Sequence, residues 1–359
     1  MITVKKEIVE LAKKLIKNNT QSSNFKELNI CLLEIKKILS KYKYIEFLKN
    51  NYKSLLFYNF LPKDKIFKLI LNCHLDIISA KPNQFNPFIK ENKLYGAGSL
   101  DMKGGLSVLV YIFKKYANKL NYPIALQVIT DEEIGGFNGT KHQLENGIRA
   151  DFVISSEPTN LDIVYKAKGI IWGNIIVKGL TAHGAYPWRG KNAIELTNKI
   201  INKLKKEFPN PKKDSWKTTI NFATLKVENT AFNKIPDKCI LSFDLRYVPE
   251  EKEQILKKIK KCLEKNSKLE IKIFEPSFFT LINNKYIEKL SKIIKKINKN
   301  KAVKRGANGS SDIRHYAVYN IDGIEFGPKG YGIGSDNEYV EIESLEKYYL
   351  ILEEFIKNI

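Results

Sequence analysis

Three short apolar runs constrain the fold of this 359-residue chain more than any other feature. They are residues 67–73, 123–130 and 152–155, and each has about the length of one buried strand. Helical patterns separate the runs, and residues 104–116 are the clearest of these patterns. Strands that alternate with helices build a parallel sheet covered on both faces. We therefore predict an α/β fold with a mostly parallel sheet, preceded by helices over residues 1–50.

Residues that can bind a metal follow each of these runs. His74 follows the first run, Glu132 and Glu133 come just after the second, and Glu157 comes just after the third. In sheets of this kind, ligands collect at the carboxyl ends of the strands. A glycine-rich turn between the first two runs adds Asp101. The sequence thus predicts one acidic, histidine-containing site at this edge of the sheet.

The pattern changes near residue 170, where a second set of elements begins. We predict, in order, a strand at 170–177, a helix at 192–208, strands at 218–228 and 239–247, a helix at 250–265 and a strand at 269–274. The β-α-β-β-α-β order is that of a compact two-layer α+β unit. The α/β pattern resumes near residue 285. We therefore expect a smaller domain, residues 170–281, inserted into a larger metal-binding domain made of residues 1–169 and 282–359.

Charge and hydropathy narrow the partners. The net charge is +22, but lysine supplies nearly all of the positive charge. Arginine, whose guanidinium can bind a phosphate through two hydrogen bonds, is scarce. We therefore expect no nucleic-acid partner, although the charge could attract anionic substrates. No apolar run reaches the roughly 18–20 residues of a membrane helix, and the first residues lack the apolar core of a signal peptide. The expected location is the cytoplasm, without membrane contact.

The cysteines favour structural packing. Cys31, Cys73, Cys239 and Cys262 form no CxxC pair, so we expect buried, reduced thiols. Cys73 adjoins His74, but neighbouring residues of a strand point to opposite faces. This geometry favours core packing of Cys73 over metal ligation.

The predicted residue types suit a pair of metal ions. Zinc binds histidine nitrogen and carboxylate oxygen, and catalytic sites keep one position open for water. Two ions about 3.5–4 Å apart can share a carboxylate, acidify a water molecule and polarise the carbonyl that the water attacks. Adjacent glutamates such as Glu132 and Glu133 allow one to bind metal while the other accepts a proton.

Taken together, the motifs resemble those of the co-catalytic zinc aminoacylase and carboxypeptidase family. This family includes succinyl-diaminopimelate desuccinylase and acetylornithine deacetylase. The segments that carry the resemblance are residues 74–76 (HLD), 98–105 (GSLDMKGG), 130–133 (TDEE), 155–158 (SSEP), 182–187 (AHGAYP) and 243–246 (FDLR). The resemblance covers nearly the whole chain.

The resemblance implies a set of metal ligands. His74 and Glu157 would be ligands of the first metal, with Asp76 orienting the imidazole of His74. Asp101 would bridge the two metals, and Glu133 would be a terminal ligand of the second.

The resemblance also implies catalytic and substrate-binding roles. Glu132 would be the general base, and His183 would stabilise the developing oxyanion. Asn233 and Arg246 would hold the substrate, with Arg246 pairing with a substrate carboxylate. Arg314 is a weaker candidate for the same task.

The chain departs from the family pattern at its C-terminal motif. Family members carry a histidine four residues before the glutamate that corresponds to Glu338, as the last ligand of the second metal; here that position is Gly334. The first metal could work alone, Asp336 or His315 could fill the vacancy, or catalysis could be lost with binding retained. The glycine could also be an engineered substitution.

The expected function follows from this resemblance. It implies an amidohydrolase that cleaves an N-acyl amino acid or short peptide with metal-activated water. N-succinyl-diaminopimelate is the first candidate substrate and N-acetylornithine the second. We expect one or two Zn²⁺ ions, with Co²⁺ as a substitute, and a homodimer whose inserted domains cover the site. The alternative is a catalytically impaired homologue that acts as a binding or scaffold protein.

Overall fold

The computed structural model describes residues 2–359, with side chains from residue 4 onward, and these divide into two compact units. The first unit holds the residues up to Tyr165 together with Phe279–Arg305 and Ser311–Ile359. The second unit holds Lys166–Phe278 and Gly306–Ser310. Within the described residues, no helix combines the length and apolar character needed to cross a membrane.

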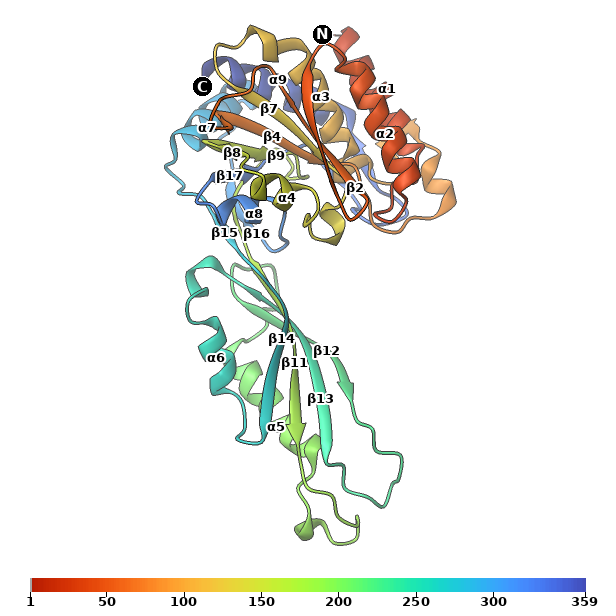
Figure 1. The fold of residues 1–359 in the computed structure, drawn as a ribbon, viewed down its shortest axis with the longest axis vertical. Coiled ribbons are helices and arrows are strands. Elements are labelled where there is room, and N and C mark those ends of the chain that lie inside the picture. Colours follow the sequence, from red (N-terminus) through yellow and green to blue (C-terminus); the bar gives the residue numbers. More distant parts are fainter. Residues whose placement is uncertain (1) are drawn as a thin grey trace. The chain divides into compact units, whose positions relative to one another are not determined.

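A nine-stranded sheet forms the centre of the first unit (Figure 1). Its order is β1 (Lys43–Lys49), β2 (Tyr52–Tyr58), β7 (Ile124–Ile129), β4 (Leu69–His74), β9 (Phe152–Ser155), β17 (Asp322–Glu325), β10 (Ile163–Ala167) and β15 (Phe278–Phe279), with β16 (Lys304–Ala307) beside β10. The four central strands, β7, β4, β9 and β17, run parallel, whereas β1, β2 and β10 pair antiparallel with their neighbours. The predicted α/β fold with a mostly parallel sheet is confirmed.

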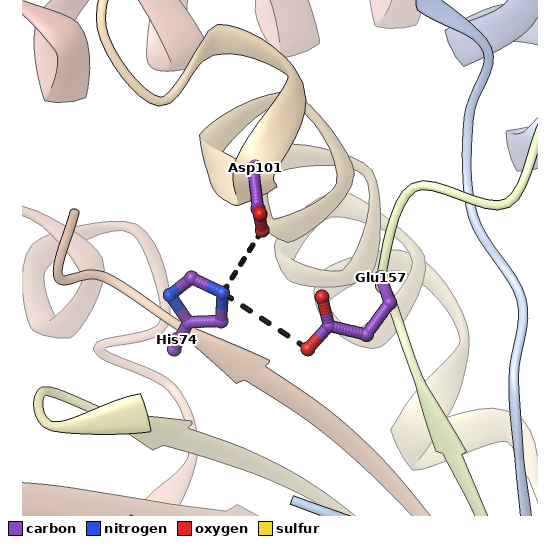
Figure 2. Close-up of side chains that lie close together, drawn as sticks. All are labelled: His74, Asp101 and Glu157. Atoms are coloured by element: carbon purple, nitrogen blue, oxygen red, sulfur yellow. Dashed lines mark hydrogen bonds and ion pairs between the residues drawn. The ribbon is translucent and has the colours of Figure 1, made fainter. Parts of the chain in front are cut away.

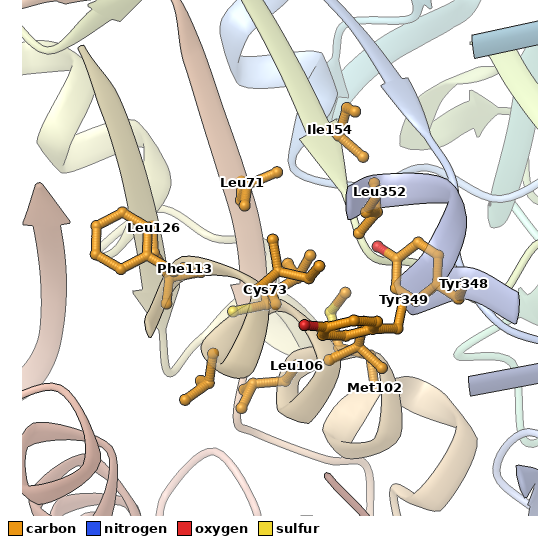
Figure 3. Packing of buried hydrophobic residues seen from close by; sticks show 14 of the residues in the cluster. Leu71, Cys73, Met102, Leu106, Phe113, Leu126, Ile154, Tyr348, Tyr349 and Leu352 are labelled. Carbon is orange, nitrogen blue, oxygen red and sulfur yellow. The ribbon is translucent and has the colours of Figure 1, made fainter. Parts of the chain in front are cut away.

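Helices bury the central strands, which explains why their sequences are mostly apolar; the buried polar residues Asn72 and Gln127 hydrogen-bond to each other. The helices are α1 (Ile2–Ile16), α2 (Phe25–Ile38), α3 (Gly104–Tyr116), α4 (Thr140–Glu145), α7 (Lys285–Asn298), α8 (Ile313–Ala317) and α9 (Ile342–Asn358). Figure 3 shows Leu71, Leu126 and Ile154 from the strands among side chains of α3 and α9. Cys73 packs in this same cluster, and all four cysteines are free and buried, as expected.

Residues 43–58 form a β-hairpin, so the prediction of helices up to residue 50 is wrong in its last part. Strands β1 and β2 pair antiparallel from Lys43↔Tyr58 to Lys49↔Tyr52. Asn50 and Asn51 turn the chain with φ of 48° and 69°, the left-handed values that a tight two-residue hairpin turn needs. The physical reason is local, because asparagine accepts this conformation more readily than most residues.

Two small sheets join segments that are distant in the sequence. One has the order β18 (Gly330–Tyr331), β19 (Tyr339–Glu341), β6 (Lys93–Tyr95) and β5 (Phe88–Lys90), and the other pairs β3 (Ile66–Phe67) with β8 (Arg149–Ala150). Tyr339 of β19 lies opposite Tyr95 of β6. This register places the residues just before β19 beside the loop that leads to Asp101.

The second unit is a four-stranded antiparallel sheet with two helices. The strand order is β12 (Thr219–Lys226), β13 (Lys238–Tyr247), β11 (Gly169–Lys178) and β14 (Ser267–Glu275), and the helices are α5 (Ala193–Glu207) and α6 (Ile255–Lys261). Burial alternates along β11 and β13, as in a sheet with one covered face. The predicted β-α-β-β-α-β order is confirmed, although α6 is shorter than the expected helix at 250–265.

Candidate active site

Three predicted metal ligands meet at the edge of the central sheet. His74 ends β4, Glu157 lies two residues beyond the neighbouring strand β9, and Asp101 precedes α3. Nε2 of His74 lies 3.2 Å from Oδ1 of Asp101 and 4.0 Å from Oε1 of Glu157. Figure 2 shows the three side chains converging on one point. Among the described residues, they are the one group of three or more His, Cys, Asp or Glu side chains close enough to hold a metal, with ligand atoms within 4.8 Å of one another.

The donor set fits a metal ion. Four ligands around zinc, at bond lengths of about 2.0–2.2 Å, lie roughly 3.4 Å from one another, close to the separations seen here. Nδ1 of His74 lies 3.0 Å from the carbonyl oxygen of Asp76, so Nδ1–H can donate there and leave the lone pair of Nε2 for a metal. Oε1 of Glu157 is buried and accepts no hydrogen bond. A buried acceptor without a donor is what a bound cation would satisfy.

Asp76 is fully buried and connects His74 to the next loop. Its carbonyl group orients the imidazole, while its carboxylate accepts the N–H groups of Glu132 at 3.1 Å and Glu133 at 2.9 Å. The hydroxyl group of Ser22 donates to the same carboxylate at 3.0 Å. Asp76 therefore fixes the turn of the paired glutamates as well as the histidine, and only the second of these roles was predicted.

Burial raises the pKa of three carboxyl groups around the site. The pKa of Glu132 rises well above its usual range because the group is buried and because Asp312 and Glu133 repel its charge. Burial raises the pKa of Glu133 to about 7. The pKa of Glu157 is raised well above its ordinary value by burial and by the charges of Asp101 and Glu132. Mutually repelling carboxylates of this kind are stabilised when a cation binds among them.

Arg314 lies behind Glu132 and is itself buried, with 4% of its surface exposed. Its guanidinium donates to the carbonyl groups of Ser311 at 2.8 Å and Gly135 at 2.7 Å, and Nη1 lies 3.9 Å from Oε1 of Glu132. This placement suits support of Glu132. The predicted contact with a substrate carboxylate stays a prediction.

Glu338 is a residue that sequence reasoning used only as a marker of the C-terminal motif. Its buried carboxylate accepts the N–H groups of Leu100 at 2.8 Å, Asp101 at 3.1 Å and Gly98 at 3.1 Å. It therefore clamps the loop that presents Asp101. No spacing in the sequence could reveal this, because the partners lie more than 230 positions apart and meet through the β19–β6 pairing.

A cavity of about 20 Å³ lies where the second metal is expected. Asp101 and Glu133 line one part of it, and Gly98, Ile78 and Gly334 line another. Apart from Glu338, which clamps the Asp101 loop, the acidic groups that line this cavity are Asp101 and Glu133. Gly334 brings only its backbone to this place.

The two residues proposed to fill the vacancy have other partners. The exposed carboxylate of Asp336 forms an ion pair with Lys81. His315 is buried, and its Nε2 lies 2.8 Å from the carbonyl oxygen of Gly135, to which it can donate. Burial and the charge of Arg314 lower the pKa of His315 to about 3, so its ring is neutral.

The remaining predicted residues, His183, Asn233 and Arg246, belong to the second unit. His183 and Asn233 are exposed and adjacent, since the N–H group of Gly184 donates to the carbonyl oxygen of Asn233 at 2.6 Å. Arg246 lies on β13 opposite Ile170 and forms a two-point ion pair with Asp244. Eight residue steps along β11 separate Ile170 from Lys178, or roughly 26 Å at about 3.3 Å per residue. His183 lies beyond Lys178, so Arg246 and His183 lie at opposite ends of this sheet.

The fold and the His/Asp/Glu cluster are those of a protein with a candidate metal site built on an α/β domain. Residues 70–358 match the sequence profile of Peptidase family M20/M25/M40, and the chain belongs to this family. The predicted family resemblance is thus confirmed. The chain is 31% identical over 314 residues to succinyl-diaminopimelate desuccinylase of Pelagibacter ubique, across 79% of this chain and 81% of the relative.

Solved structures share the fold, and two of them illustrate the likeness. Aminopeptidase PepT from Bacillus cereus has a TM-score of 0.82 at 20% identity and covers 98% of both chains. An M20 family metallo-carboxypeptidase from Sulfolobus solfataricus has a TM-score of 0.77, also at 20% identity, with 98% of both chains covered. Family membership and the desuccinylase relative together identify the chain as a metal-dependent hydrolase of amide bonds.

Proposed function

We propose that this hydrolase removes the acyl group from an N-acyl amino acid, with N-succinyl-diaminopimelate as the first candidate substrate and N-acetylornithine as the second. The observation that carries the proposal is the carboxylate of Glu132, whose side chain is only 14% exposed, beside the cluster of His74, Asp101 and Glu157. The desuccinylase relative favours the succinyl substrate, because it is 31% identical over most of both chains.

The residues of the cluster have separate tasks in this proposal. A Zn²⁺ ion held by His74, Asp101 and Glu157, or Co²⁺ in its place, would activate water and polarise the amide carbonyl. Glu132 accepts the proton of the attacking water and returns it to the nitrogen of the leaving amine. Asp76 holds the backbone of Glu132, and Arg314 faces the carboxylate of Glu132 from behind.

Substrate binding falls to the second unit. His183 stabilises the negative charge that develops on the carbonyl oxygen, and Asn233 and Arg246 hold the substrate. The ion pair of Arg246 with Asp244 uses two of the five N–H donors that a guanidinium carries, so donors remain for a substrate carboxylate.

A homodimer is part of the proposal. Arg246 and His183 of one chain lie at opposite ends of the same sheet, and the β11 residues between these ends, Ile170 to Lys178, alone span roughly 26 Å by strand rise. That separation exceeds the reach of a single small N-acyl amino acid. This separation supports a homodimer in which the second units pair and a partner subunit supplies one of the two residues.

Hydrolysis by the zinc-loaded chain tests the proposal. We expect metal-dependent release of succinate from N-succinyl-diaminopimelate, abolished by a chelator. Glu132→Gln should lower kcat by about 10²–10⁴-fold while its metal content stays unchanged. Glu343→Gln, an exposed change on α9, is the matched control and should behave as the parent chain. Full activity of Glu132→Gln would contradict the assignment of the general base.

Gly334 favours one alternative, a homologue that binds substrate without turning it over. Calorimetry with N-succinyl-diaminopimelate separates the two functions. Binding of the substrate by the zinc-loaded chain without release of succinate would support the binding protein. Binding followed by turnover would support the hydrolase.

A further inference from the structure

We propose that this chain binds one metal ion tightly, at His74, Asp101 and Glu157, and that the cavity beside Gly334 holds water in place of a second ion. The inference rests on the proposed function for the first position only. It departs from the two-metal arrangement that the sequence resemblance implies.

The second metal position is short of ligand atoms. A zinc site needs about four ligand atoms, three of them usually from the protein. The cavity receives the carboxylates of Asp101 and Glu133, and Asp101 already faces His74. Both are oxygen donors, whereas the first position has an imidazole nitrogen as well. Oxygen-only sites hold zinc more weakly than sites with nitrogen and favour harder cations.

The side chains near the second metal position have other partners. Glu338 lines the cavity, but both of its oxygens accept backbone N–H groups from the Asp101 loop. Asp336 is directed to Lys81 on the surface. The Nε2 atom of His315 is placed against the carbonyl oxygen of Gly135. Among the described residues, each of these three side chains therefore already has a partner in the protein.

The backbone at Gly334 also disfavours a side chain at this position. Its φ of 69° lies in the left-handed region, which side chains rarely adopt, although histidine tolerates it better than most. A Cβ atom built there would lie 2.5 Å from Cδ1 of Ile78. The end of the Ile78 side chain thus occupies the space that a side chain at 334 would enter. The cavity of about 20 Å³ is large enough for one water molecule.

Metal content measured by mass spectrometry decides the question. The whole chain is loaded with excess Zn²⁺, freed of loose metal by gel filtration and measured without substrate. We expect one zinc per chain, and two per chain would overturn the inference. Because no substrate is present, a failure of the hydrolase proposal leaves this count unaffected.

Two matched variants assign the metal to its ligands. Glu157→Gln should lose the zinc, because it removes a ligand of the occupied position. Glu133→Gln should still hold one zinc per chain. In a two-metal centre, Glu133→Gln would instead reduce the content from two to one. Loss of zinc from Glu133→Gln, or full retention by Glu157→Gln, would contradict the assignment.

A repaired variant tests the cause. Gly334→His, combined with Ile78→Ala to clear the contact with the new Cβ atom, should raise the content from one zinc per chain to two. Ile78→Ala alone is the control and should remain at one. If the double variant is folded by circular dichroism and still binds one zinc, the missing histidine is not what limits the second position, and the argument from donors fails.

Discussion

The carboxylate of Glu338 accepts three backbone N–H groups, so the effect of changing this residue can be worked out contact by contact. We consider Glu338→Gln, which keeps the shape of the side chain and removes its charge. The amide oxygen can still accept the N–H groups of Leu100 and Asp101. The amide nitrogen then faces the N–H group of Gly98, and two donors meet without an acceptor.

The expected cost follows from these three contacts. Hydrogen bonds to a charged group contribute about 1.5–3 kcal/mol each and neutral ones about 0.5–1.5 kcal/mol, so two bonds weaken by about 1 kcal/mol each. The unmatched donor pair adds about 1–3 kcal/mol. Burial raises the pKa of Glu338, and the neutral amide avoids part of that burial cost. The net loss in the free energy of unfolding is about 2–4 kcal/mol.

The same change should weaken metal binding, because the clamped loop presents Asp101. Loss of a contact that orients a ligand typically lowers metal affinity about 10–100-fold. Urea denaturation of the metal-free chain measures the first effect, and zinc titration against a chelating dye measures the second. Asp336→Asn, an exposed change two residues away, is the control and should alter neither. If Glu338→Gln matches this control in both assays, the clamp has no role in the site.

Three further predictions follow from buried groups and the metal. Arg314→Met should lower kcat with little change in KM, because the guanidinium faces Glu132; a rise in KM alone would instead indicate a contact with substrate. The pKa of Asp131, raised to about 7 by burial, exceeds its ordinary unfolded value of about 3.9. The folded state therefore binds the extra proton, and stability should fall as the pH rises from about 4 through 7. Asp131→Asn should flatten that slope in urea denaturation by up to about 1.4 kcal/mol per pH unit. Chelation should lower the thermal midpoint of the parent chain, and Glu157→Gln should remove the difference between the metal-loaded and chelated samples.

The parts of the fold that sequence predicts are those with local patterns. β4, β7 and β9 are mostly apolar runs, and the structure places His74 and Glu157 at the ends of two neighbouring strands, with Nε2 of His74 4.0 Å from Oε1 of Glu157. Parallel pairing makes this outcome general, because the carboxyl ends of such strands share one edge. The hairpin at residues 43–58 escaped prediction, since its Leu and Ile residues also fit a helical stripe and the decisive signal is the left-handed turn at Asn50 and Asn51.

The parts that sequence does not predict depend on contacts between distant segments. The sequence alone suggests Asp76 as a partner of His74, because only two positions separate them. Its hydrogen bonds to the Glu132–Glu133 turn, however, span more than 50 positions. Arg314 similarly reaches Glu132 from a helix near the other end of the chain. A residue type and its spacing cannot tell whether a buried arginine will face a substrate or a neighbouring carboxylate. Only the packing of α8 within the first unit decides it.

The C-terminal motif has two physically independent roles: Glu338 clamps the Asp101 loop, and position 334 would supply a metal ligand. The site could therefore lose the ligand at 334 and still keep His74, Asp101 and Glu157. The clamp depends on Glu338, whose position is fixed by the pairing of β19 with β6 directly after it. The missing ligand would stand four residues earlier, in a loop whose glycines at 332 and 334 adopt positive φ. Replacing the side chain at 334 therefore leaves the hydrogen bonds to Gly98, Leu100 and Asp101 intact. Asp101 stays in reach of His74, so selection or engineering could remove the second position while the first keeps its geometry.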